Sequence, residues 1–211
     1  MDSQLQQVKT VYFDLGNVIV FFSYPKMVDQ IATCTGLTFD AVKSLLFDHK
    51  LRDLAETGKI SSSDLYQRLK KESSRPFSFL ELNEAFSDIF TPNEAIFPII
   101  TALKEKKIRL ILLSNTSESH FNRVYSRYPI LRLFDEMILS YQVGVAKPNP
   151  LIFKKALAKA DCAPTHCFYT DDIPEYVSAA RKTGLDAEVF TTAAALQGHL
   201  ASRGCVLEEK K

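Results

Sequence analysis

The stretch from Val11 to Val20, VYFDLGNVIV, is an apolar run interrupted by Asp14, Gly16 and Asn17. The apolar residues before the aspartate are typical of a strand buried on both faces of a parallel sheet. A carboxylate at the end of such a strand is costly to bury unless it has a partner or a task. Asp14 is therefore the first candidate functional residue, and the next question is what it faces.

The rest of the chain predicts the sheet that this strand enters. Strand-like apolar runs occur at Val8 to Leu15, Arg109 to Asn115 and His166 to Thr170, with weaker ones at Met137 to Tyr141 and Ala187 to Phe190. Helical segments lie between them and begin at Pro98, Pro150 and Pro174, because proline suits the first turn of a helix. The alternation predicts an α/β fold with a Rossmann-like parallel sheet core and helices on both faces.

Residues 21–91 have a different sequence pattern, because strand-like runs are replaced by amphipathic segments separated by Gly, Ser and Pro. Helix-start signals there are Thr38 and the capping-box pairs Ser61 with Asp64 and Ser78 with Glu81. We expect an inserted α-helical domain over residues 21–91, a catalytic core over residues 1–20 and 92–205, and a flexible tail over residues 206–211.

Composition narrows the class of protein. The 211 residues suffice for one domain with a large insertion, and the net charge of +1 makes no case for binding nucleic acid or an anionic membrane. No secretory signal or membrane-spanning run is visible, so we expect a cytoplasmic protein with no membrane partner. The four cysteines form no C-x-x-C pair and are expected to be reduced, and the oligomeric state stays open.

Polar residues follow the predicted strands at the edge where parallel sheets collect their ligands. They are Asp14, then Ser114 with Asn115, then Lys147 at a helix entry, then Asp171 with Asp172. Together they offer a carboxylate nucleophile, hydrogen-bond donors, a cation and an acidic pair. A phosphate monoester repels an anionic nucleophile, so carboxylate attack needs a cation and positioned donors of this kind.

The same residues suit Mg²⁺, which prefers oxygen ligands and keeps several waters. Asp14, the backbone carbonyl of Gly16 and Asp172 would be its ligands. Ser114 and Asn115 could then hydrogen-bond to or orient the phosphate oxygens, beside the cation of Lys147.

The motif order FDLGNV, LLSN, KP and DD resembles the haloacid dehalogenase superfamily, chiefly its Mg²⁺-dependent phosphatases, over most of the chain. The resemblance implies that Asp14 forms an aspartyl-phosphate, that Ser114 and Lys147 hold the phosphate, and that Asp172 binds Mg²⁺, with Asp171 as a second acid. Within the superfamily, the motifs are most similar to bacterial sugar-phosphate phosphatases and to the phosphatase domain of soluble epoxide hydrolases.

The resemblance also implies that residues 21–91, called the cap below, close over the site and choose the substrate. The implied substrate is a small phosphorylated metabolite, with sugar phosphates among the candidates. Tyr24, Arg52 and Asp53 of the cap are candidates to face it, whereas the four histidines show no metal-ligand spacing and are expected to be surface or packing residues.

Two positions depart from the family's pattern. Gly16 stands where the phosphatases have the aspartate that protonates the leaving oxygen, and Tyr176 stands where the family commonly has Asp or Asn. Loss of general acid catalysis typically costs about 10² to 10⁴-fold in rate. It predicts a slow enzyme, a substrate with a good leaving group or a replacement acid. A catalytically weak or inactive protein that binds a phosphorylated metabolite is therefore the alternative, and a metal-independent dehalogenase is a third hypothesis.

Overall fold

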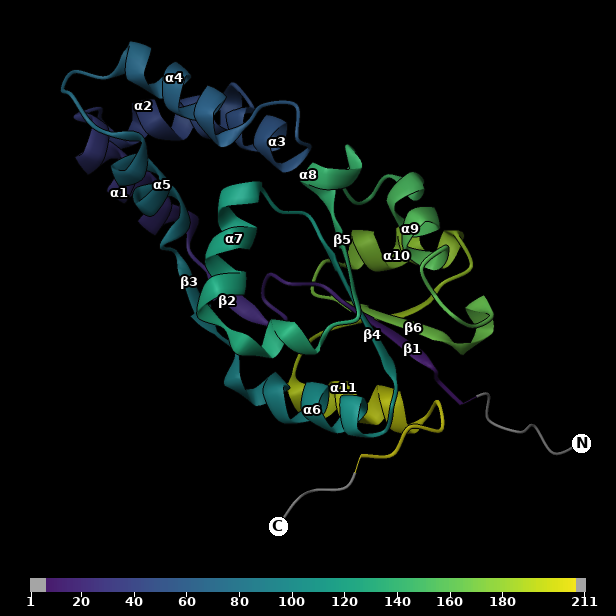
Figure 1. Cartoon of the computed structure of the whole chain (residues 1–211). Coiled ribbons are helices and arrows are strands. Elements are labelled where there is room, and N and C mark those ends of the chain that lie inside the picture. The colour runs from purple at the N-terminus through teal and green to yellow at the C-terminus, as the bar shows by residue number, and fades with distance from the viewer. Residues whose placement is uncertain (1–6, 208–211) are drawn as a thin grey trace, which may run out of the picture.

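The computed structural model describes residues 7–207 and shows a five-stranded, all-parallel sheet with strand order β5-β4-β1-β6-β7 (Figure 1). The strands are β1 (Thr10–Phe13), β4 (Arg109–Ser114), β5 (Glu136–Leu139), β6 (Cys167–Asp171) and β7 (Asp186–Val189). All five predicted strands are present. The strand that carries Asp14 lies at the centre, so this carboxylate emerges where the sheet is most enclosed.

Helices cover both faces of the sheet, as the alternating pattern predicted. Phe13 of β1 points into the cluster built with α6 (Phe97–Glu105), α7 (Glu118–Arg127) and α11 (Ala193–Ala201), while Tyr12 joins the cluster with α9 (Pro150–Leu157) and α10 (Pro174–Lys182). Both side chains are fully buried. Alternate residues of the central strand therefore anchor it to two opposite helical layers, which fixes the direction in which its end projects.

The cap contains five α-helices, α1 to α5, placed to one side of the sheet in Figure 1. They are α1 (Tyr24–Thr35), α2 (Phe39–Lys43), α3 (Leu51–Glu56), α4 (Ser62–Glu72) and α5 (Phe79–Ser87), with a π-helical turn at Ser44–Asp48. The two predicted capping boxes are present at the starts of α4 and α5, and the Thr38 side chain caps α2. None of the described helices combines the length and apolarity that crossing a membrane requires.

A short antiparallel ribbon of β2 (Val20–Phe22) and β3 (Phe90–Pro92) joins the cap to the core. The predicted boundaries at residues 21 and 91 fall inside this ribbon, and the division of the chain into domains stays a prediction. Residues 1–6 of the predicted core and 208–211 of the predicted tail lie outside the described residues. The remaining short elements are α8 (Ser140–Val143) and the 3-10 turns Glu94–Ile96, Pro129–Leu133 and Pro164–His166.

The cap meets the core where the sheet strands end. Helix α8 begins directly after β5, and its first residue, Ser140, lies within hydrogen-bond distance of the backbone carbonyls of Glu56 in the cap and Thr116 in the core. The cap therefore covers the carboxyl ends of the strands, where ligands of open α/β sheets collect.

Candidate active site

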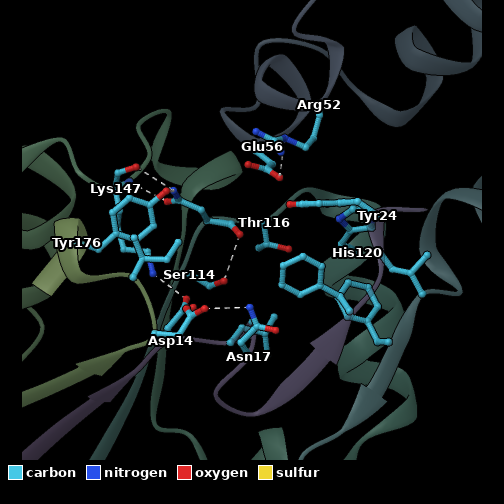
Figure 2. A pocket seen from close by; sticks show the side chains of 18 residues that line it. Asp14, Asn17, Tyr24, Arg52, Glu56, Ser114, Thr116, His120, Lys147 and Tyr176 are labelled. Atoms are coloured by element: carbon cyan, nitrogen blue, oxygen red, sulfur yellow. Dashed lines mark hydrogen bonds and ion pairs between the residues drawn. The ribbon is translucent and has the colours of Figure 1, made fainter. Parts of the chain in front are cut away.

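A cavity of about 240 Å³ lies between the strand ends and the cap (Figure 2). Its core side, called the floor here, carries Asp14, Lys147 and Asp172, with Asp171 buried next to them. Its cap side, called the roof here, carries Tyr24, Arg52 and Glu56. The volume lies slightly below the range of about 300–1,000 Å³ usual for ligand pockets, so the cavity suits a small molecule.

Asp14 follows β1 directly, and its backbone N–H donates to the Thr170 carbonyl of the neighbouring strand over 3.0 Å. This bond continues the sheet ladder by one residue and fixes the backbone from which the carboxylate projects. The residue is only 7% exposed, yet it lines the cavity. A carboxylate held so rigidly meets the positional demand on a nucleophile.

Lys147 reaches the floor from the loop before α9 and binds two carboxylates at once. Its Nζ lies 2.7 Å from Asp14 Oδ1 and 2.6 Å from Asp171 Oδ2, and it also contacts the Leu113 carbonyl at 3.0 Å. Burial acts to lower the pKa of this lysine, but the two carboxylates outweigh burial and the pKa is raised. Lys147 is therefore a fixed positive charge beside Asp14.

Burial raises the pKa of Asp14, with Lys147 opposing the shift and Asp171 adding to it. The floor thus has three carboxyl groups, those of Asp14, Asp171 and Asp172, beside the single positive charge of Lys147. The pKa of Asp172 is also raised, first of all by burial. A bound divalent cation would relieve both shifts by favouring the ionised carboxylates.

The two acids of the predicted pair have different surroundings. Asp171 is fully buried, and both its oxygens have protein partners: Oδ2 binds Lys147 and accepts from the Tyr169 hydroxyl, and Oδ1 accepts from the Ile173 backbone N–H over 2.8 Å. Asp172 lines the cavity, and its Oδ2 accepts from the Asn17 amide over 2.9 Å. Asp171 thus positions Lys147, whereas Asp172 faces the cavity.

A cation would meet a suitable donor set here. One carboxylate oxygen from each of Asp14, Asp171 and Asp172 lies within 4.8 Å of the others. Such hard oxygen donors fit Mg²⁺, which needs only one or two carboxylates from the protein. Because Asp171 is already engaged, Asp14 and Asp172 are the two acids that fit the ion best.

Ser114 is the last residue of β4, Asn115 follows it, and both line the cavity. The amide of Asn115 spans the backbone of Lys147: its Oδ1 accepts from the Lys147 N–H over 2.7 Å, and its Nδ2 donates to the Lys147 carbonyl over 2.9 Å. Asn115 is therefore bound to the loop that carries the lysine. Ser114 is 2% exposed, and its hydroxyl donates only a long hydrogen bond of 3.4 Å to the Asn115 carbonyl.

Tyr176 has a comparable supporting place. Its hydroxyl lies 3.3 Å from Asn115 Nδ2, and its ring centroid lies 5.2 Å from Lys147 Nζ. A cation over an aromatic face is stabilised by the ring quadrupole. The tyrosine therefore supports the lysine through its ring.

Gly16 lines the cavity next to the Phe22 ring. A Cβ built on Gly16 would lie 2.8 Å from Cε1 of the Phe22 ring, closer than real Cβ atoms approach other atoms. The Phe22 ring packs on Tyr24, with 4.8 Å between ring centroids. An aromatic side chain of the ribbon therefore lies where a side chain at position 16 would begin.

The roof includes a carboxyl group that the sequence analysis missed. Glu56, on α3, lines the cavity with Arg52, whose Nε lies 3.6 Å from Glu56 Oε1. Burial raises the pKa of Glu56 to about 7, although Arg52 opposes the shift. The i,i+4 spacing of the two residues in the sequence was the available signal, but it is common on solvated helix faces.

Arg52 and Tyr24 line the cavity as considered, whereas Asp53 does not. The Arg52 guanidinium lies 5.2 Å from the Tyr24 ring centroid and 5.1 Å from that of Phe47. Asp53 is half-exposed and binds Arg52 from outside, at 2.7 Å. The roof is thus an arginine held between aromatic rings and carboxyl groups.

His120 also lines the cavity, although it packs as predicted. Its Nε2 lies 2.9 Å from the Phe86 carbonyl of the cap, and its ring stacks on the Phe86 ring with 4.3 Å between centroids. Burial lowers its pKa to about 4, so the neutral ring donates its Nε2 proton to that carbonyl. His120 links core to cap and has no proton to spare for the cavity.

Comparison with known proteins agrees with this arrangement. Residues 8–184 match the family model described as haloacid dehalogenase-like hydrolase. The chain is similar to a D-ribitol-5-phosphate phosphatase of Bacteroides thetaiotaomicron, at 24% identity over 85% of this chain and 90% of the relative. It is also similar to a phosphorylated carbohydrates phosphatase of Thermotoga maritima, at 26% identity over 50% of this chain. That match spans 49% of the relative, about half its length.

Solved structures show the same fold. A haloacid dehalogenase family enzyme of Bacteroides thetaiotaomicron, in complex with magnesium and inorganic phosphate, superposes with a TM-score of 0.78 at 21% identity. The match covers 88% of this chain and 95% of that one.

Proposed function

The chain belongs to the haloacid dehalogenase-like hydrolases, and from that premise we propose that it is a Mg²⁺-dependent phosphatase of a small phosphorylated metabolite. The observation that carries the proposal is the floor of the cavity. One buried lysine binds Asp14 and Asp171. The carboxylate of Asp172 lies within 4.8 Å of both, so that one metal ion could contact all three acids. Phosphoryl transfer to a carboxylate needs this combination of anionic nucleophile and fixed positive charge.

In the proposed reaction, Asp14 attacks phosphorus in line with the departing oxygen and forms an aspartyl-phosphate. An alcohol leaves, and water then hydrolyses the aspartyl-phosphate. Lys147 and the Ser114 hydroxyl stabilise the phosphoryl oxygens, and Asn115 holds the Lys147 backbone in position. Asp14, Asp172 and the Gly16 carbonyl would hold Mg²⁺, which supplies positive charge to the phosphoryl oxygens when bound.

We propose a sugar or polyol phosphate as the substrate class. The roof supports this choice because Tyr24, Arg52 and Glu56 present a hydroxyl, a guanidinium and a carboxyl group, which can hydrogen-bond to several hydroxyl groups. The small cavity volume limits the organic part of the substrate. Two relatives named as phosphatases of ribitol 5-phosphate and of phosphorylated carbohydrates point in the same direction.

A phosphometabolite-binding protein with little turnover is the second candidate, because Gly16 offers no proton. A metal-independent dehalogenase is the third. The acidic cluster argues against it, since a halide displacement at carbon has no need for three carboxylates around one cation position.

The deciding experiment measures phosphate release from sugar phosphates, nucleotides and 4-nitrophenyl phosphate, with Mg²⁺ and with EDTA, for the wild type and Asp14→Asn. Mg²⁺-dependent release that the substitution removes supports the phosphatase. Ligand binding with no release from any substrate supports the binding protein. Turnover of a haloacid that persists in EDTA supports the dehalogenase.

A further inference from the structure

The cavity lacks a proton donor at the usual place and holds a different one opposite. Gly16 has no side chain, and a Cβ built there would lie 2.8 Å from the Phe22 ring. An alkoxide is a poor leaving group, so the phosphatase proposed above needs a proton for the departing oxygen. The donor must come from another side chain that lines the same cavity.

We propose that Glu56 of the cap is the general acid of this enzyme, protonating the leaving-group oxygen in place of the missing carboxyl group at position 16. The inference rests on the proposed phosphatase function. Figure 2 shows Glu56 on the roof and Asp14 on the floor, at opposite sides of the cavity. In an in-line displacement the leaving oxygen departs on the side of phosphorus away from the nucleophile. A donor on the roof is therefore on the correct side.

The other titratable groups of the cavity are unsuited to the task. Lys147 is held in two ion pairs, and Asp172 belongs to the cation position. His120 is neutral and donates its proton to the Phe86 carbonyl. The pKa values of Tyr24 and Tyr176 are raised, chiefly by burial, which makes both phenols weaker acids still.

Glu56 has surroundings that suit proton transfer near neutral pH. Burial favours its protonated form and brings its pKa to about 7, close to the optimum for general acid catalysis. Asp53 acts in the same direction, while Arg52, Lys147 and a hydrogen bond with Tyr24 stabilise the ionised form. The hydroxyl of Tyr24 points toward the carboxyl group in Figure 2. Arg52 and Tyr24 can thus stabilise the carboxylate left after the proton has moved.

The proton balance closes over the two half-reactions. As an Asp14 oxygen bonds to phosphorus, the bond from phosphorus to the leaving oxygen breaks and its electron pair takes the Glu56 proton, so a neutral alcohol leaves. The Glu56 carboxylate then accepts a proton from the water that attacks the aspartyl-phosphate. Phosphate is released, Asp14 is regenerated, and Glu56 is protonated again.

The test compares leaving groups in the wild type and Glu56→Gln, which keeps the shape of the side chain. The substrates are three alkyl phosphates (glucose 6-phosphate, ribose 5-phosphate and glycerol 3-phosphate) and 4-nitrophenyl phosphate, whose phenolate leaves without a proton. We expect Glu56→Gln to lower kcat/KM for the alkyl phosphates by about 10² to 10⁴-fold and for the aryl phosphate by less than about threefold. The wild-type rate with alkyl phosphates should fall as pH rises through about 7, and the variant should lack that fall.

Glu72→Gln is the matched control, because it makes the same change at the exposed end of α4 in the cap and does not line the cavity. It should leave both rates unchanged, and thermal unfolding should show that both variants are folded. Equal losses on alkyl and aryl phosphates would overturn the acid role. Two results would overturn this inference but support the phosphatase. One is phosphate release that depends on Asp14 and is unchanged in Glu56→Gln, and the other is wild-type release from the aryl phosphate alone. No release from any substrate would overturn both.

Discussion

The floor and the roof of the cavity hold carboxyl groups in two different ways. On the floor, Asp14 and Asp171 share one buried lysine, and Asp171 is fully enclosed by fixed partners. On the roof, Glu56 faces an arginine at 3.6 Å on a helix whose neighbouring residues are partly exposed. The parallel sheet thus provides charges at fixed positions, and the cap provides groups on a separate helix that lies over the sheet.

This difference predicts which substitutions affect the reaction itself and which affect the fold. The floor charges depend on one another, so removing one alters all of them. Substitutions of the roof groups are expected to change proton donation to the leaving group and the choice of substrate. The predictions below test that division, from the largest expected effect to the smallest.

The largest effect should come from Asp14→Asn, which removes the nucleophile but keeps its shape. We expect turnover to fall by roughly 10⁴ to 10⁶-fold, the scale found when one member of a covalent catalytic unit is removed. The protein should remain folded, because Lys147 retains Asp171 as a partner. Phosphate-release kinetics and thermal unfolding measure the two effects, and a rate within tenfold of wild type would refute the role of Asp14.

Lys147→Met should damage both the fold and the reaction. It leaves Asp14 and Asp171 buried next to each other without a counter-charge, and losing one partner of a buried ion pair typically costs about 3–5 kcal/mol. Urea unfolding measures this loss of stability. Adding Asp171→Asn should restore part of the stability without restoring activity. If the double variant is no more stable than the single one, the two carboxylates are not coupled through the lysine.

His120 predicts a pH dependence at the contact between core and cap. Its folded-state pKa is about 4, below the ordinary value of 6.5, so the unfolded state binds the proton more readily. Its stabilising contribution is complete above pH 6.5 and is lost as pH falls through 4, by up to about 3 kcal/mol. Unfolding free energies of the wild type and His120→Gln between pH 4 and 7 should converge as pH falls. Parallel curves would contradict the assignment.

The smallest effect expected is a stabilisation by Mg²⁺. An ion that binds only the folded protein adds about 2.7 kcal/mol at a concentration 100 times its dissociation constant. We expect Mg²⁺ to raise the unfolding temperature of the wild type by a few degrees and that of Asp172→Asn by less, with EDTA reversing both. Asn17→Ala is a milder comparison, because it removes only the amide that orients Asp172. Equal shifts in all three proteins would place the ion elsewhere.

Much of the fold was predictable from local pattern. The central strands are short apolar runs between turn signals, and all five lie within about two residues of their predicted ends. The expected strand from Met137 to Tyr141 ends early, because Ser140 turns into α8 and bonds to the backbone of both cap and core. The β2–β3 ribbon was missed, since its three-residue strands are recognisable only by their pairing across about 70 positions.

The sequence by itself determined the family, the order of its motifs and the presence of a carboxylate, a lysine and an acidic pair at strand ends, because these depend on local spacing along the chain. Only the tertiary structure decided that Asp171 binds Lys147 while Asp172 faces the cavity, since adjacent residues at a strand end point in opposite directions. It also decided that Glu56 faces Asp14 across the cavity. That placement depends on how the cap packs over the sheet, which no spacing within the sequence records.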